Sequence, residues 1–389
     1  MRARTCSRSA KARRAVAVAV AARVAVIRLR HVAFATVVWA GGQAFAADRA
    51  HSSVLIYSDT DHVQVISPTV AGSVDVGKTT VSSTVSTDLI SAASVDLVTA
   101  ASPKGFTETR TQVDAAGRYA FGDGRNLDAG YHLSSEPDFL THAVRAGGTA
   151  DVLSRQVSLG ATYGYSHSDI GRTRDTSFYR QRQNHDIDLS LTRLLSPVAA
   201  VDLAYGLSFV DGFQANAYRY VRLYASETGM HETSVAEQTP NTRQRHTLTM
   251  RIRSRLLPSL FGLGEYRFYA DSWGMLAHTV TLRTALRLGS DVWTLSFEAR
   301  GHLQNAANFY RSRYVTFPLA PDFRTADKEL GPMWTALGGT HLEWSPAVTR
   351  IEAVRLSVGA DVLHLRYLDY AFLTSRTAML LSVALTLEN

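Results

Sequence analysis

The sequence predicts an all-β protein, a transmembrane antiparallel β-barrel of about 16 strands, with 14 strands as the main alternative. Segments in which apolar and polar residues alternate recur to the end of the chain, and 201–209 is the clearest of them. A strand there has one apolar face and one wet face, because successive side chains point to opposite sides. Beyond residue 46, no apolar run reaches the ~20 residues that a spanning helix needs. The third observation is that the connections alternate between short and long.

Residues 1–46 are expected to be a cleaved signal peptide. They hold nine Arg and Lys, no acidic residue and an apolar core at 31–40. Ala44, Phe45 and Ala46 then form an A-x-A cleavage pattern, so the mature barrel is expected to span 47–389. The basic part is long, which leaves open a start downstream of Met1 or an extended signal. Arg13-Arg14 lacks the flanking residues of a twin-arginine signal, and the core is too short for a membrane anchor.

Alternation bounded by turn residues places the strands in order. Segment 79–90 sets valines and a leucine against Ser, Thr and Asp, 156–166 sets Val, Leu and Tyr against Ser and Gly, and 246–257 sets Leu, Met and Ile against Thr and Arg. The first strand is short and weak. The expected strands are 54–57, 63–76, 79–90, 107–120, 126–133, 141–152, 156–166, 185–195, 201–209, 246–257, 260–271, 277–288, 292–304, 334–344, 354–366 and 376–387.

The lengths of the connections support a barrel rather than a soluble sandwich or propeller. Short connections are expected at Gly77, Gly122, Leu153, Ser196, Pro258, Gly289 and Pro346. Longer ones are expected at Ser58, Ala92, Ser134, Asp169, Gln214, Ser272, Asn305 and Tyr367. The two sets interleave, as in bacterial barrels with short periplasmic turns and long extracellular loops. A sandwich has no such sidedness, and the chain has no propeller-blade repeat.

Charge and cysteine content exclude several classes of protein. The formal net charge is +7, but removing the nine positive charges of residues 1–46 leaves −2, so nucleic acid is not an expected partner. Cys6, the only cysteine, lies in the same segment, so the mature chain has no disulfide or thiolate. The expected location is the outer membrane of a Gram-negative cell, and the expected partners are outer-membrane lipid and the barrel-assembly machinery.

Several stretches resemble an uncharacterised family of bacterial outer-membrane proteins, domain of unknown function 3570. They are Asp88-Leu-Ile-Ser-Ala-Ala-Ser-Val-Asp96, Thr99-Ala-Ala-Ser102, Glu108-Thr-Arg110, Ser134-Ser-Glu-Pro-Asp-Phe139, Asp211-Gly-Phe-Gln-Ala-Asn-Ala-Tyr-Arg219, and Tyr266-Arg-Phe-Tyr-Ala-Asp-Ser-Trp-Gly274 with His278-Thr279. The resemblance implies a barrel in the outer membrane and no particular reaction, and it hints at periplasmic redox-related proteins as partners. One departure is the end of the chain at Asn389, where such barrels usually have a terminal aromatic residue.

A charged patch on neighbouring strands is the candidate functional site. Its side chains share the polar faces of four strands, so they are expected to line the lumen: Arg251, Arg253, Arg255, Glu265, Arg267, Arg283, Arg287, Glu298 and Arg300. One interpretation is a constriction that favours anions. The other is a network of ion pairs that braces or fills the lumen, as in small barrels. Aromatic residues such as Tyr163, Tyr205 and Trp293 are expected at the lipid boundary instead.

No enzyme, metal or cofactor motif stands out. Ser166 and His167 point to opposite faces of a strand, and the chain has no H-E-x-x-H, P-loop or G-x-G-x-x-G sequence. The Ser/Asp-rich groups at 58–61 and 88–96 lack the spacing of a calcium loop. The favoured function is therefore a porin-like pore or transport channel for small solutes. The alternatives are a structural barrel with a closed lumen that docks a periplasmic partner and, more weakly, an outer-membrane hydrolase.

Overall fold

The computed structural model describes residues 48–92, 106–289, 292–348 and 351–389, which form a closed antiparallel β-barrel of 16 strands. Around the barrel the order is β1-β18-β17-β16-β15-β14-β13-β12-β9-β8-β7-β6-β5-β4-β3-β2, and β10 and β11 form a separate two-stranded sheet. The predicted fold class and strand number are confirmed. The described residues contain no helix that is long and apolar enough to cross a membrane.

The strands are long, and their bounds are as follows: β1 Arg49–Asp59, β2 Val63–Val76, β3 Thr79–Ala92, β4 Phe106–Gly122, β5 Arg125–Glu136, β6 Phe139–Val152, β7 Val157–Ile170, β8 Arg180–Ser196, β9 Ala199–Gly212, β10 Tyr220–Tyr224, β11 His231–Ala236, β12 Thr242–Leu257, β13 Leu260–Asp271, β14 Leu276–Leu288, β15 Trp293–Gln304, β16 Met333–Trp344, β17 Ala353–Tyr367 and β18 Ser375–Glu388.

An apolar belt covers the outside of the barrel. Leu203 and Phe209 on β9 are exposed, whereas Asp202, which precedes Leu203 and points to the other face, is buried. The register carries the same face to the neighbouring strands, since Leu203 lies opposite Leu191 of β8 and Met250 of β12. A folded barrel can expose so many large apolar side chains because they face lipid rather than water. The described chain therefore has the design of an outer-membrane barrel.

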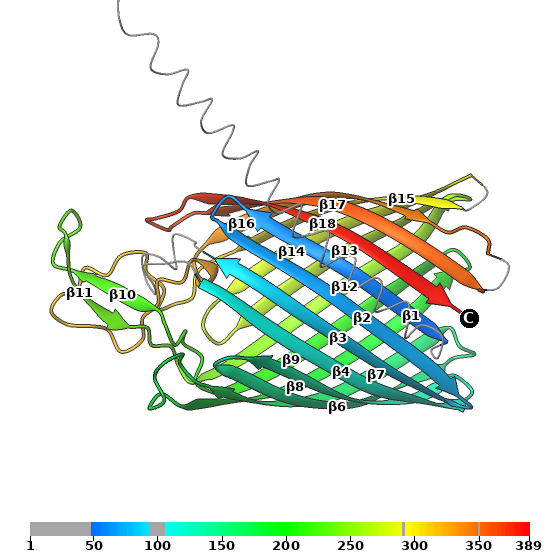
Figure 1. Ribbon diagram of the computed structural model, residues 1–389, viewed down its shortest axis with the longest axis horizontal. Helices are drawn as coiled ribbons and strands as arrows, with labels where there is room; N and C mark the ends of the chain where they lie inside the picture. The colour runs from blue at the N-terminus through cyan, green and yellow to red at the C-terminus, as the bar shows by residue number, and fades with distance from the viewer. Residues whose placement is uncertain (1–47, 93–105, 290–291, 349–350) are drawn as a thin grey trace, which may run out of the picture.

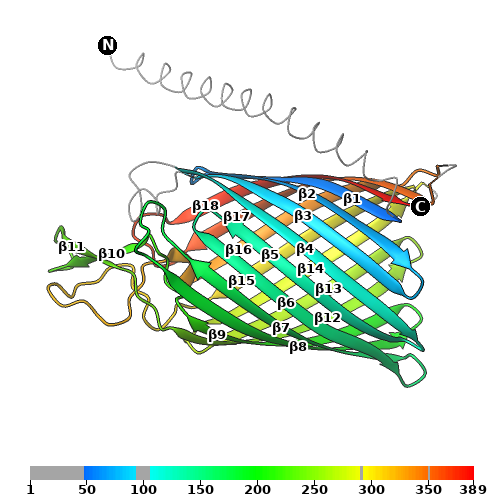
Figure 2. The same ribbon diagram turned by 60° about the horizontal axis from the view of Figure 1, so that its bottom comes forward.

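The two ends of the barrel differ, as Figures 1 and 2 show. One end, which we call the turn rim, carries the connections at 77–78, 123–124, 153–156, 197–198 and 258–259, together with the carboxyl terminus. The other end, the loop rim, carries 171–179, 213–241, 305–332 and 368–374. In both views the β10–β11 hairpin lies beyond the loop rim.

Four connections differ from the expected lengths, and one of them is the longer connection expected at Ser272, which is only the four-residue turn 272–275. Segment 134–138 was expected to be a long loop, but Ser134 and Ser135 pair with Thr141 and Leu140, which leaves only 137–138 as the turn. Similarly, β1 runs to Asp59, because its small and polar residues pair along their whole length with both β2 and β18. On the turn rim, the connection at Pro346 is longer than expected and spans 345–352. Small and hydroxyl side chains fit both faces of a strand, so alternation alone did not reveal these strand ends.

The expected loop at 214–243 is also partly wrong, because it contains β10 and β11 and its last two residues begin β12. These short strands pair with each other and not with the barrel. Val221 and Leu223 are 0% and 1% exposed, because they pack against Tyr314 from another loop. Long-range packing of this kind leaves no periodic signal in the sequence.

Candidate functional site

All nine residues of the predicted charged patch lie on the lumen face of β12–β15. The lipid face of these strands is identified by exposed residues such as Met250, Tyr266 and Leu282. The patch residues occupy the alternate positions, and Arg251 lies directly opposite Glu265, as Arg283 does opposite Glu298. Arg243, Arg245 and Asp271 share this face with the patch. The lumen faces of the four strands therefore carry nine arginines and three carboxylates in all.

Three of the patch arginines are neutralised by neighbouring carboxylates. Arg251 Nε donates to Glu265 at 2.7 Å, and Arg283 Nε donates to Glu298 at 2.7 Å. Arg253 donates to Asp202 of β9 at 2.5 Å, a partner that the sequence did not suggest. These ion pairs link β9, β12, β13, β14 and β15 across the wall, so they contribute to the shape of the lumen and little to its net charge.

Three other patch arginines are not paired with a carboxylate in the described residues: Arg255 near the turn rim, and Arg267 and Arg300 farther along the lumen. Within the described residues, Arg267 and Arg300 have no carboxylate within 4.0 Å. Both line a cavity of about 580 Å³ in the loop-rim half of the lumen, and Arg267 also borders a second cavity of about 260 Å³ with Asp188 and Ser190. Arg267, Asp188 and Ser190 are all exposed although they point inward. The lumen is thus not filled by its own side chains at this level.

The wall opposite the arginines is acidic. In the closed order, β3, β4 and β5 lie eight strands away from β13, β14 and β15. Their lumen faces carry five carboxylates (Asp88, Glu108, Asp114, Asp128 and Glu136) and two arginines (Arg110 and Arg118). The lumen therefore has a basic wall facing an acidic wall.

The turn-rim half of the lumen is less polar. A cavity of about 750 Å³ is lined there by Phe261, Leu263 and Ala285, with Arg253, Arg255 and Arg283 at its edge. Arg287 lies over the Phe261 ring, with its guanidinium carbon 4.8 Å from the ring centroid. This cavity follows the patch along the lumen, since Arg283 and Glu298 border both it and the 580 Å³ cavity.

Loops from four hairpins pack into one structure over the loop rim, which we call the cap (residues 171–179, 213–241, 305–332 and 368–374). Leu223 of β10 forms a bridge with Tyr314, and Gln238 exchanges backbone hydrogen bonds with Arg324. The hydroxyl of Ser312 donates to Asp369 at 2.5 Å, and Arg172 donates to the carbonyl of Ala217 at 3.0 Å. Glu329 and Leu330 of the cap line the 580 Å³ cavity, so the cap borders the lumen directly.

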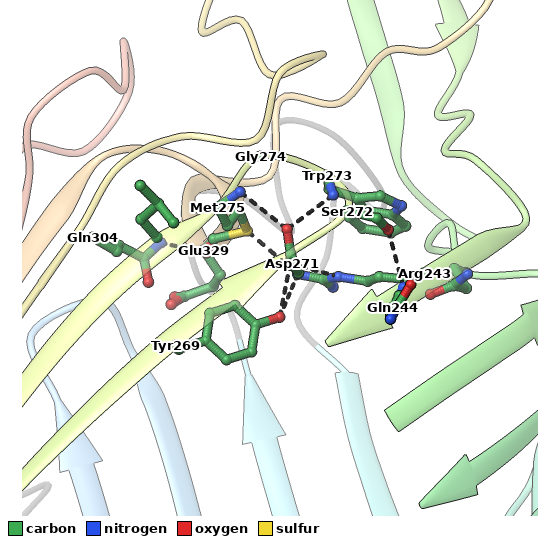
Figure 3. A network of polar contacts seen from close by, with 12 residues as sticks. Arg243, Gln244, Tyr269, Asp271, Ser272, Trp273, Gly274, Met275, Gln304 and Glu329 are labelled. Carbon is green, nitrogen blue, oxygen red and sulfur yellow. Dashed lines mark hydrogen bonds and ion pairs between the residues drawn. The ribbon is translucent and has the colours of Figure 1, made fainter. Parts of the chain in front are cut away.

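A network around Asp271 holds the 272–275 turn against the barrel wall at the loop rim (Figure 3). The Asp271 side chain is 0% exposed and accepts hydrogen bonds from the Tyr269 hydroxyl at 2.7 Å, Arg243 Nε at 2.8 Å and two backbone N–H groups of its own turn. Arg243 also stacks on Trp273, with its guanidinium carbon 4.0 Å from the ring centroid. Gln304, at the end of β15, donates to the carbonyls of Glu329 and Gly331. The two Gln304 bonds fix the cap at the point where it meets the lumen.

Glu237 is a buried carboxylate inside the cap. It accepts from the Thr325 hydroxyl at 2.5 Å and from the backbone N–H of Asn216 at 2.6 Å, and Arg219 lies 3.5 Å away. Burial raises the pKa of Glu237 above its usual value of 4.5, although Arg219 and the hydrogen bonds oppose the shift. The joint between the two large loops therefore contains a titratable group.

Residues 171–361 match the family described as protein of unknown function (DUF3570). The resemblance predicted from the sequence is confirmed over this part of the chain. The DUF3570 match contains the whole basic wall and the two large cap loops, as well as the stretches 211–219, 266–274 and 278–279 on which the resemblance rested. The other stretches, between 88 and 139, lie outside the match.

Solved structures with similar folds are outer-membrane proteins of several kinds. A bacterial polysaccharide outer membrane secretin is 9% identical, with a TM-score of 0.49 over 87% of this chain and 98% of that chain. CdiB from Acinetobacter baumannii is 10% identical, with a TM-score of 0.48 over 87% and 60%. OprD from Pseudomonas aeruginosa is 8% identical, with a TM-score of 0.42 over 87% and 94%. No curated protein matches the chain in sequence.

The residues nearest to a catalytic set lie outside the predicted patch and are incomplete. In the lumen, His341 Nε2 lies 3.0 Å from Asp361, and the other ring nitrogen points toward the gap above Gly359, on the side of Ser382. Within the described residues no hydrogen bond joins Ser382 to His341, and the histidines that contact a threonine hydroxyl (His51, His302 and His364) are not those that contact a carboxylate. Nothing in this geometry favours the hydrolase alternative.

The acidic groups noted in the sequence are bound by protein donors. Asp59 accepts from the Tyr57 hydroxyl and from two backbone N–H groups, and Asp88 accepts from Arg110 and Ser67. Segment 93–105, which contains the rest of the second group, lies outside the described residues. Glu108, Glu136 and Asp138 come together at the loop rim, where Asp138 accepts from Tyr218 and Thr173 of the cap. These contacts attach the cap to the acidic wall.

Proposed function

We propose that this protein is an outer-membrane channel for small anionic solutes, with the turn rim in the periplasm and the cap at the cell surface. This orientation follows the rule that bacterial barrels keep their short connections in the periplasm. It implies a leader removed near Ala46, outer-membrane lipid around the belt and assembly by the barrel-assembly machinery. The observation that carries the proposal is the pair of arginines, Arg267 and Arg300, that border open space in the lumen and have no carboxylate within 4.0 Å among the described residues.

An anion in the lumen gains most near these two side chains. A guanidinium group presents fixed N–H donors that match carboxylate and phosphate oxygens. In a narrow passage with protein walls, an uncompensated charge acts over a longer range than it does in bulk water. The acidic wall on β3–β5 opposes the entry of anions, so an anion is expected to follow the basic wall, and a solute that has both charges would be oriented between the two walls.

Reversal potentials in planar bilayers under a salt gradient test the proposal. The wild-type channel should select anions over cations. The Arg267→Ala/Arg300→Ala variant removes two unpaired charges and should lose most of that selectivity, while its conductance stays the same or rises because the lumen is wider.

A matched control removes charges that are already paired. Arg251→Gln/Glu265→Gln replaces a neutralised pair on the same wall, so its reversal potential should stay within error of the wild-type value. If the two double variants shift the potential equally, the unpaired arginines are not the source of selectivity. A purified barrel that gives no channels at all would refute the proposal.

A second candidate function, a surface-docking barrel with a closed lumen, is favoured by the cap. Its loops are joined by side-chain and backbone bonds rather than lying free, and Glu329 and Leu330 reach the lumen. A silent wild-type barrel that begins to conduct when residues 306–331 are replaced by a short Gly/Ser linker would support this function instead.

A further inference from the structure

Four tyrosine–histidine pairs stand on the lipid face of the barrel. The Tyr131 hydroxyl lies 2.6 Å from His142 Nδ1. The same two atoms lie 2.7 Å apart in the pairs Tyr163–His185, Tyr205–His246 and Tyr266–His278. Ring centroids are 6.1–6.2 Å apart in all four pairs. Neither the lumen nor the cap uses these residues.

The four pairs repeat one geometry. Each tyrosine is the sixth residue after the first residue of its strand, on β5, β7, β9 and β13. Each histidine is on the next barrel strand, two residues nearer the loop rim than the residue opposite the tyrosine; His185, for example, precedes Ile187, which faces Tyr163. The pairs thus form a row at one level along eight consecutive strands, β5–β9 and β12–β14, which make up half of the circumference.

This row lies at the edge of the apolar belt that is nearer the cap. Along β6, Val152 at the turn rim is ten positions after His142. At ~3.4 Å per residue and a tilt of ~40°, they correspond to a height of about 26 Å, close to that of the apolar band of such barrels. Below the row the lipid face is apolar, with side chains such as Val144 and Leu248, and above it the face is mixed, with Gln183 and Gln244 beside the exposed Phe209 and Leu276. The pairs are therefore at the depth of lipid head groups.

Each pair has one donor to spare. A neutral imidazole and a phenol carry one N–H and one O–H between them, and their mutual hydrogen bond uses one of these. Whichever tautomer is present, the other N–H or O–H is free of that bond. Tyr131, Tyr163 and Tyr266 are 41%, 48% and 44% exposed, and His142, His185 and His278 are exposed as well. A donor at the edge of a hydrocarbon layer is costly unless it finds an acceptor.

We propose that this row of four pairs is a docking surface for phosphate-bearing head groups of lipids in the outer leaflet. Phosphate oxygens are strong acceptors, and aromatic rings with a polar edge suit the boundary between head groups and hydrocarbon. A second copy of this chain fits the row less well, because an isologous contact would bring spare donors against spare donors. The lipid would then be held on one half of the barrel and not the other.

Native mass spectrometry of the detergent-solubilised protein tests the proposal, with bisphosphorylated lipid A and the same lipid without its phosphates as probes. The wild type should bind the phosphorylated probe more tightly. Replacing all four histidines by phenylalanine (His142→Phe/His185→Phe/His246→Phe/His278→Phe) keeps the rings and removes the donors, so affinity should fall about tenfold. The control His364→Phe changes a lipid-facing histidine on the other half of the barrel, which bonds to Thr377 instead of a tyrosine, and should leave the affinity unchanged.

The same spectra contain the results that would overturn the proposal. Equal binding of both probes by the wild type, or equal affinity in the wild type and the four-histidine variant, would refute it. A protein dimer that is present in the wild type and lost in the variant would assign the row to a second copy of the chain. The histidine variant must first show the gel shift of a folded barrel. If it does not, the variant Tyr131→Phe/Tyr163→Phe/Tyr205→Phe/Tyr266→Phe replaces it in the same measurement. An unchanged preference of that variant for the phosphorylated probe would then refute the proposal.

Discussion

At the scale of single residues, pairing rather than position determines what an arginine in the lumen does. Arg251 and Arg267 lie on the lumen faces of adjacent strands and look alike in the sequence. Arg251 donates to Glu265, whereas Arg267 borders two cavities and has no carboxylate within reach in the described part of the chain. The sequence predicted both in one patch. Alternation along a strand shows which face of the strand a side chain is on, but it does not show which neighbouring carboxylate that side chain contacts.

Asp271 is the residue whose loss should cost the most stability at the loop rim. Replacing it by alanine leaves Arg243 largely buried without its partner, and such a loss typically costs about 3–5 kcal/mol. Urea unfolding in lipid vesicles, followed by tryptophan fluorescence, measures the change. Asp271→Asn keeps an acceptor for the turn and should cost less; equal losses in both variants would show that the charge of Asp271 alone, and not its hydrogen bonds to the turn, accounts for the stability.

Glu237 should make the stability of the cap depend on pH. Its folded-state pKa lies above the unfolded value near 4.5, so the folded cap binds the proton more tightly than the unfolded segment does. The cap should therefore be most stable below about pH 4.5 and lose stability as pH rises toward the raised pKa. Hydrogen exchange of 231–241, corrected for the intrinsic effect of pH, should show this loss, and Glu237→Gln should flatten it. Protection that increases with pH in the wild type would contradict the assignment.

At the scale of elements, each strand is divided between lipid and lumen, and the division sets its tolerance to charge. On β12 the lipid face carries Leu248, Met250 and Ile252, and the lumen face carries Thr247, Thr249 and Arg251. Most of the strand predictions were confirmed because this division follows a period of two in the sequence. The ends of β1 and β5 were missed because small polar side chains carry no such contrast.

Met250→Arg should destabilise the barrel by about 2–4 kcal/mol, since Met250 lies near the middle of the apolar belt. Thr249→Arg, the adjacent position on the lumen face, should cost much less because the new charge meets water. Reversible unfolding of the two variants in vesicles of the same lipid gives the comparison. A larger loss for Thr249→Arg would mean that the two faces have been assigned the wrong way round.

At the scale of the whole molecule, the chain is a barrel with a charged lumen and a packed cap, and these parts were predictable to different degrees. The barrel depends on local alternation, which a single sequence displays. The cap depends on contacts such as Leu223 with Tyr314 and Glu237 with Thr325, which join distant segments. The tyrosine–histidine row has a visible signal, Tyr-x-apolar on one strand and His-x-apolar on the next. The partners are 11, 22, 41 and 12 residues apart, however, so only the strand register reveals the repeat.

Swelling of proteoliposomes in three solutes of similar size, gluconate, glucose and glucosamine, tests most directly whether the barrel is an open channel that favours anions. The account predicts swelling above that of empty liposomes in all three, fastest in gluconate and slowest in glucosamine, because the unpaired Arg267 and Arg300 attract the carboxylate and repel the amine. Rates equal to those of empty liposomes, or faster swelling in glucosamine than in gluconate, would contradict it.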